Sequence, residues 1–166
     1  MFFGLLVALL LSLGGLAAAM PTTVLLVRHA EKVDDGTKDP VLSDAGQARA
    51  IALAEVAREH GVTHVFTSQY QRTILTGAPA AEVCGARATV MDASKADDLL
   101  AAVRALPAEA VVLIVGHSNT VPPLAEKLGA VSVAPMTEAE YDRLLVLTTT
   151  VDGAVTVVVS RYGEGS

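Results

Sequence analysis

Two histidines and two arginines in this chain follow apolar runs that are typical of buried strands. Arg28 and His29 come at the end of TVLLVR, His117 follows AVVLIVG, and Arg72 lies four residues beyond Ser68, which follows THVFT. Because the carboxyl ends of parallel strands meet at one edge of a sheet, where ligands bind, we expect these side chains to lie close together.

Such a group of side chains is suited to phosphoryl transfer. Two guanidinium groups repel each other unless an anion lies between them, and arginine binds phosphate or carboxylate through a two-pronged contact. Neighbouring arginines also lower the pKa of a histidine, so that the imidazole stays neutral and nucleophilic. The pattern therefore predicts a phosphohistidine intermediate. We expect no metal and no cofactor, because the guanidinium groups supply the charge and no acidic residue lies beside either histidine at a ligand spacing.

The composition indicates one folded domain and excludes several functions. The chain has 166 residues, with 12 basic and 18 acidic side chains and a net charge of −6. Non-specific binding of DNA or RNA needs a concentrated basic surface, so we expect no nucleic acid partner. The single cysteine, Cys84, excludes an intramolecular disulfide and a cysteine-based zinc site.

The first 20 residues carry no charge and have the pattern of an export signal. An apolar run over residues 2–16 is followed by three alanines at 17–19, as in a signal peptide with its cleavage site. We interpret residues 1–19 as a signal peptide and residues 20–166 as the domain, secreted or periplasmic and without stable membrane association after cleavage. Two alternatives stay open. One is an uncleaved anchor, although the run is short for a membrane span. The other is a true start at Met20, which would make the protein cytoplasmic.

The hydrophobic pattern predicts an α/β domain. Strand-like and helical runs alternate, and continuous apolar strands are typical of a mainly parallel sheet with helices on both faces. Asp152-Gly153 predicts a C-terminal antiparallel hairpin. We expect a helix cap at Ser43 or Asp44, and residues 138–140 look like a helix start. The predicted strands are residues 23–28, 63–67, 89–91, 110–115, 144–150 and 155–160, and the predicted helices are residues 45–60, 71–83, 97–106 and 121–128.

Four segments of the chain resemble motifs of the histidine phosphatase superfamily, which has the phosphoglycerate mutase-like fold. They are RHAEK at 28–32, LSDAGQARA at 42–50, TS at 67–68 with RT at 72–73 and Thr76, and VGHSN at 115–119. Each motif is weak alone, but four in the same order and spacing are specific. The chain looks closest to the small, single-domain members, some of which are phosphohistidine phosphatases.

The resemblance implies a role for each matching residue. His29 would be the phosphorylated nucleophile, and Ser68 matches a position that usually supports the phosphate pocket. The catalytic residues implied are His29, Arg28, Arg72 and His117, and the phosphate-binding residues implied are Arg28, Arg72, His117, Ser68 and Asn119.

The chain departs from the family at the general acid. Ser118 follows the second histidine, where the acid phosphatases and phytases carry aspartate, and residues 77–95 are too short for the insertion that supplies a glutamate in the mutases. The remaining candidates are Glu31, Glu82 and Asp92. Without an acid, alkyl phosphates react slowly, whereas aryl phosphates and phosphohistidine have leaving groups that depart more easily.

We therefore expect a metal-independent phosphohydrolase that acts on a phosphorylated small molecule or a phosphoprotein through His29. A start at Met20 favours a phosphohistidine protein as substrate, and a cleaved leader favours a secreted or envelope phosphomonoester. Two alternatives remain. One is a catalytically silent module of the same fold that only binds phosphate, and the other is an isomerase of the phosphoglycerate mutase type.

Overall fold

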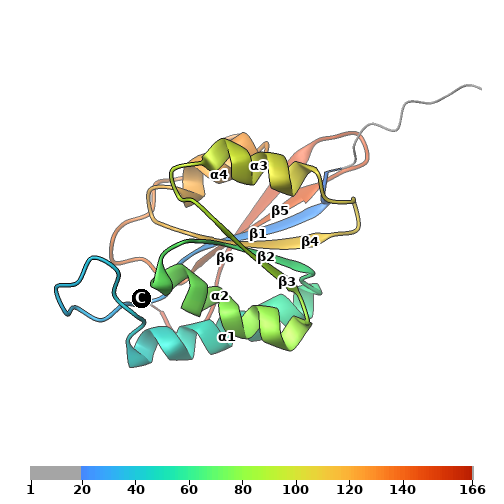
Figure 1. Ribbon diagram of the computed structural model, residues 1–166. Helices are drawn as coiled ribbons and strands as arrows, with labels where there is room; N and C mark the ends of the chain where they lie inside the picture. Colours follow the sequence, from blue (N-terminus) through green and yellow to red (C-terminus); the bar gives the residue numbers. More distant parts are fainter. Residues whose placement is uncertain (1–19, 166) are drawn as a thin grey trace, which may run out of the picture.

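A six-stranded sheet forms the centre of the molecule, and helices cover both of its faces (Figure 1). The computed structural model describes residues 20–165, so the predicted leader and its cleavage site lie outside the described residues. The strands are β1 (Thr23–Arg28), β2 (His64–Ser68), β3 (Arg87–Met91), β4 (Val111–Gly116), β5 (Arg143–Thr149) and β6 (Val155–Arg161). The helices are α1 (Asp44–His60), α2 (Gln71–Cys84), α3 (Ala96–Arg104) and α4 (Val121–Lys127). Each predicted strand and helix is present, with ends that differ by a few residues.

The strand order is β3-β2-β4-β1-β5-β6. β1 pairs with β4 in parallel, and β2 pairs in parallel with β3 and β4. β5 is antiparallel to β1 and to β6, which confirms the mainly parallel α/β class with a C-terminal hairpin. The carboxyl ends of β1, β2 and β4 therefore share one edge, and Arg28 lies opposite Gly116 in the register.

Both faces of the central strands are buried, which explains their continuous apolar sequences. α1 and α2 cover one face, and α3 and α4 cover the other (Figure 1). Along β1, Leu25 and Val27 pack into the cluster beneath α1 and α2, whereas Leu26 packs into the cluster beneath α3 and α4. Within residues 20–165, no helix is long and apolar enough to cross a membrane.

The start of α1 is fixed to the loop that follows β1. Of the two predicted caps, Ser43 is the one used: its Oγ accepts a hydrogen bond from the backbone N–H of Gly46 at 3.2 Å. The backbone N–H of Ser43 donates to the carbonyl of Glu31 at 3.0 Å. Gly46 packs so closely on this carbonyl that a Cβ atom there would lie 2.0 Å from the oxygen.

Residues 138–140 do not begin a helix, which corrects the expectation from their sequence. They form a turn between α4 and β5. The guanidinium of Arg28 donates hydrogen bonds to the carbonyl oxygens of Thr137, Glu138 and Glu140. A helix would need these oxygens for its own backbone bonds, so the contact with a distant side chain replaces the local preference.

Gly46→Ala tests whether the contact between α1 and the β1 loop is tight. Alanine has the higher helix propensity by about 1 kcal/mol, so propensity alone predicts stabilisation. We expect instead a loss of about 1–3 kcal/mol in the free energy of unfolding, because the new methyl group overlaps the Glu31 carbonyl. Urea unfolding measures this change. Ala45→Gly, at an exposed position of the same helix, reports the propensity effect alone, and a stabilised Gly46→Ala variant would contradict the prediction.

Candidate active site

The two histidines of the motifs lie next to each other at the carboxyl edge of the sheet. His29 follows β1 and His117 follows β4, and these strands are neighbours. The backbone N–H of His29 donates to the carbonyl of Gly116 at 2.9 Å, and the two imidazole centroids lie 5.4 Å apart. The register of two parallel strands thus sets the spacing of the two rings.

His29 is held as a neutral imidazole with its lone pair on Nε2. The residue is 4% exposed, and its Nδ1 lies 2.8 Å from the carbonyl oxygen of Ala30. Because a carbonyl can only accept, Nδ1 carries the proton and Nε2 is free. Burial lowers the pKa of His29 to about 4, and the charges of Arg28 and Arg72 act in the same direction. At neutral pH the ring is therefore available as a nucleophile.

His117 is also kept neutral. Burial lowers its pKa to about 4, and the charges of Arg72 and Arg28 add to this effect. Its Nε2 lies 3.1 Å from the Oγ of Ser68, at the end of β2, and this Oγ lies 2.8 Å from the Oγ1 of Thr73 in α2. The second histidine is thus oriented by groups from β2 and α2.

Arg28 is almost completely buried, with 2% of its side chain exposed. Its Nη1 donates to the carbonyls of Thr137, Glu138 and Glu140 at 3.1, 2.7 and 3.2 Å. Its Nη2 donates to the carboxylate of Glu138 at 2.8 Å. The guanidinium carbon also lies 4.1 Å from the centre of the Tyr141 ring. Backbone carbonyls therefore fix one edge of the guanidinium, and the other edge faces an anionic group.

Arg72 reaches the same region from the first turn of α2. Its guanidinium carbon lies 4.4 Å from the centre of the Tyr70 ring, and its Nη1 lies 3.7 Å from a carboxylate oxygen of Asp39. The same carboxylate oxygen accepts the backbone N–H of Gln71 at 2.9 Å. Asp39 thus caps α2, whose N-cap residue makes no such bond, and also holds Arg72 in place.

These groups line a cleft of about 620 Å³. Within residues 20–165, its charged lining consists of the cations Arg28, Lys32, Lys38 and Arg72 and the carboxylate of Glu138. The chain as a whole is acidic, so the positive cleft is a local feature that favours an anionic ligand. The other lining residues are His29, Thr37, Pro40, Tyr70, Ala93, Ser94, His117, Ser118, Asn119 and Thr120. Of the predicted phosphate-binding residues, only Ser68 lies outside this lining, where it contacts His117.

The three predicted acid candidates do not face the cleft. Glu31 is bound by Arg49, whose Nε and Nη2 donate to its carboxylate at 2.7–2.9 Å. Partial burial, the largest single effect, would raise the pKa of Glu31, but the hydrogen bonds from Arg49, a backbone hydrogen bond and the charges of Arg49 and Arg28 together lower it. Glu82 is exposed near the end of α2, and Asp92 accepts hydrogen bonds from the backbone and hydroxyl of Ser94.

Glu138 is a member of the site that the sequence did not reveal. Its carboxylate binds Arg28 and also accepts a hydrogen bond from the Oγ of Ser118 at 2.5 Å. The hydrogen bond from Ser118 and the charge of Arg28 lower the pKa of Glu138. An ionised carboxylate therefore lies on the guanidinium edge that is open to anions. Its local sequence resembled a helix start and carried no sign of a contact with β1.

Comparison with known proteins finds similarity to one family of sequences and one fold. The sequence model of the histidine phosphatase superfamily (branch 1) matches residues 24–95. A probable phosphoglycerate mutase GpmB from Yersinia enterocolitica is 37% identical over 68 residues, which covers 37% of this chain and 32% of that protein. The chain thus spans about a third of the length of this curated relative.

Solved structures extend the likeness over most of the domain. The putative phosphohistidine phosphatase SixA from Nakamurella multipartitia is 25% identical with a TM-score of 0.63, over 86% of this chain and 96% of that one. The protein histidine phosphatase SixA complexed with tungstate is 19% identical with a TM-score of 0.66, over 84% and 96% of the two chains. A mycobacterial glucosyl-3-phosphoglycerate phosphatase complexed with VO3 is 15% identical with a TM-score of 0.64, over 86% and 100%.

Over residues 24–95 the chain is therefore similar to the histidine phosphatase superfamily, and its fold is the one that these solved structures share. The matched segment, residues 24–95, contains Arg28, His29 and Arg72. His117 lies beyond it and enters the site through the pairing of β4 with β1. The low identities to the tungstate and VO3 complexes mean that those structures show the fold alone.

The contact between Glu138 and Arg28 predicts that the Glu138 carboxylate competes with an anion that binds in the cleft. We expect Glu138→Gln to tighten the binding of inorganic phosphate by up to about tenfold, because the substitution removes a like charge a few ångströms away. Isothermal titration calorimetry at neutral pH measures the Kd. Glu109→Gln removes a charge from an exposed position outside the cleft and serves as the control. Unchanged or weaker binding in Glu138→Gln would contradict this competition.

The buried histidines predict a loss of stability in acid. In the folded chain the pKa values of His29 and His117 are about 4, below the ordinary value of 6.5. The unfolded chain therefore binds more protons between these values, and stability falls as the pH is lowered from about 6.5 to about 4. For His29, the more deeply buried of the two, a shift of this size corresponds to about 3 kcal/mol at most.

Urea unfolding at pH 7 and pH 4.5 checks this prediction. We expect the stability of His29→Asn to change less between the two pH values than that of the unsubstituted chain, because one buried proton acceptor is gone. His60→Asn, at an exposed position at the end of α1, keeps the full pH dependence. Equal pH dependence in the unsubstituted chain and in His29→Asn would show that His29 has no lowered pKa.

Proposed function

We propose that the protein is a phosphohydrolase that transfers a phosphoryl group from its substrate to His29 and then to water. The observation that carries this proposal is the state of His29, a neutral imidazole with a free Nε2 in a positively charged cleft. A phosphate in this cleft would bring its phosphorus to a nucleophile that needs no base, because its other nitrogen already holds the proton.

The proposed reaction has two steps. In the first, Nε2 of His29 attacks phosphorus, an N–P bond forms, the bond to the leaving group breaks, and the electron pair departs with that group. In the second, water attacks phosphorus and the N–P bond breaks, which returns neutral His29 and releases inorganic phosphate. The Nη2 edge of Arg28, the guanidinium of Arg72 and an N–H of His117 would stabilise the negative charge of the transferring oxygens.

The cleft is suited to leaving groups that are stable as anions or that already carry a proton. The carboxylate that lines the described cleft, Glu138, is kept ionised by Ser118 and Arg28 and so has no proton to give. General acid catalysis is worth about 10²–10⁴ in rate, and an alkyl phosphate would lose that factor. An aryl oxide or an imidazole leaves without it. We therefore propose an aryl phosphate or a phosphohistidine as the substrate class.

Hydrolysis of phenyl phosphate and of phosphoramidate by the full chain tests this proposal. We expect both activities to persist in EDTA, because guanidinium groups supply the charge, and His29→Ala to lower kcat/KM by at least about a thousandfold, or about 4 kcal/mol. His60→Ala, an exposed histidine at the end of α1, should keep full activity. Quenching the reaction in alkali should trap a phosphorylated chain that His29→Ala does not form.

Two results would overturn the proposal. Equal rates in the unsubstituted chain and in His29→Ala would exclude His29 as the nucleophile. Absence of turnover in the unsubstituted chain, together with tight binding of phosphate, would favour the alternative of a catalytically silent phosphate-binding module.

A further inference from the structure

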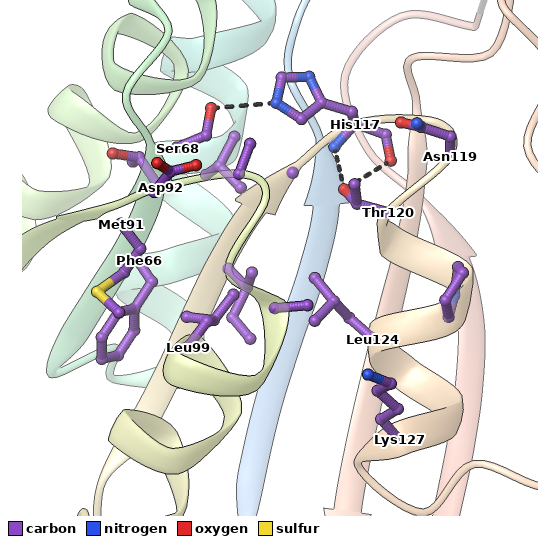
Figure 2. Close-up of a pocket in the computed structure, with 17 residues that line it drawn as sticks. Phe66, Ser68, Met91, Asp92, Leu99, His117, Asn119, Thr120, Leu124 and Lys127 are labelled. Atoms are coloured by element: carbon purple, nitrogen blue, oxygen red, sulfur yellow. Dashed lines mark hydrogen bonds between the residues drawn. The ribbon is translucent and has the colours of Figure 1, made fainter.

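A second cavity of about 200 Å³ adjoins the cationic cleft (Figure 2). It lies between the sheet and the helices α3 and α4. The two cavities share Ala93, His117, Asn119 and Thr120 in their linings, so they meet at the loop that follows β4. A group bound beside His117 would therefore lie next to this second cavity.

The cavity is polar at the end that meets the cleft and mainly apolar along the rest of its length, with Lys127 beyond Leu124 (Figure 2). Figure 2 shows Ser68, His117 and Asn119 at one end, and the side chains of Leu99 and Leu124 farther along. The other apolar lining residues are Phe66, Met91, Ala93, Ala96, Ile114, Val115 and Pro123. The lining also includes Thr67 and the charged residues Asp92 and Lys127.

The size and chemistry of this cavity fit an aromatic ring or a short branched hydrocarbon. An engineered apolar cavity of about 150 Å³ in another protein stays free of water and binds benzene. An unfilled apolar cavity also destabilises a fold, because the atoms that line it lack packing partners. Its apolar surface and its opening beside His117 therefore favour an apolar occupant that enters from the cleft.

We propose that this apolar cavity holds the organic part of the substrate, so that the substrate is the phosphate ester of an aryl or similarly compact apolar group. The proposal rests on the proposed function, because the phosphate of the same molecule would occupy the cationic cleft. It narrows the substrate class, since of the two leaving groups that need no proton donor an aryl oxide matches the apolar lining better than an imidazole does. Ala96 and Leu99 would then determine specificity by the space that they leave.

Binding of two phosphonates to the full chain tests the cavity without requiring turnover. Methylphosphonate fills the anion site alone, and benzylphosphonate adds an aromatic ring. By calorimetry we expect benzylphosphonate to bind at least tenfold more tightly, which equals about 1.4 kcal/mol. Ala96→Leu should abolish this difference by filling the cavity, and it should leave the Kd of methylphosphonate within twofold, which also shows that the variant is folded. Ala101→Leu, at an exposed position of the same helix, should retain the full preference.

The outcomes separate this proposal from the proposed function. Equal affinity for the two phosphonates in the unsubstituted chain, or an unchanged preference in Ala96→Leu, would overturn the apolar subsite even if His29-dependent hydrolysis of phosphoramidate is observed. A tenfold preference that Ala96→Leu removes would support the subsite, and hydrolysis that does not depend on His29 would then overturn only the proposed reaction. Failure of both phosphonates to bind would overturn both.

Discussion

The buried guanidinium of Arg28 is the constraint on which the rest of the site depends. A charge at the end of a central strand loses its hydration, and it is tolerated only where hydrogen bonds and an opposite charge replace the water. The turn at residues 137–140 supplies three carbonyl oxygens for this purpose, and Glu138 supplies the carboxylate. The connection between α4 and β5 is thereby drawn over the carboxyl edge of β1. The same contact orients Nη2 toward the cleft and helps to keep both histidines neutral.

A second set of contacts fixes the loop that follows His29. Glu31 lies two residues beyond His29, and its carboxylate is bound by Arg49 of α1, which also donates to the carbonyl of Tyr162 after β6. Gly46 allows α1 to approach the Glu31 backbone closely. The acidic residue nearest to the nucleophile therefore serves to fix the loop. Because the carboxylate of Glu31 binds Arg49, the closeness of Glu31 to His29 in the sequence was a poor guide to a proton donor.

The fold and the centre of the site could be predicted from the sequence, because both follow from short-range patterns. Apolar runs located β1 and β4, and the rule that parallel strands share a carboxyl edge brought His29 and His117 together. The partners of these residues could not be predicted. Residues 138–140 have the local composition of a helix start, and only the tertiary contact with Arg28 makes them a turn. The apolar cavity depends on how α3 and α4 pack on the sheet, which no pattern within either helix specifies.

The two cavities impose opposite demands on a ligand, and together they limit its chemistry more than either does alone. The cationic cleft favours an anion, and the phosphate that we propose for it is carried by many metabolites. The apolar side chains that make up most of the neighbouring cavity disfavour polar groups, which would lose their hydration against them without gaining hydrogen bonds. The ionised state of Glu138 further disfavours leaving groups that need a proton. An aryl phosphate meets all three conditions, because its anion binds the guanidinium groups, its ring is apolar, and its oxide leaves without acid catalysis.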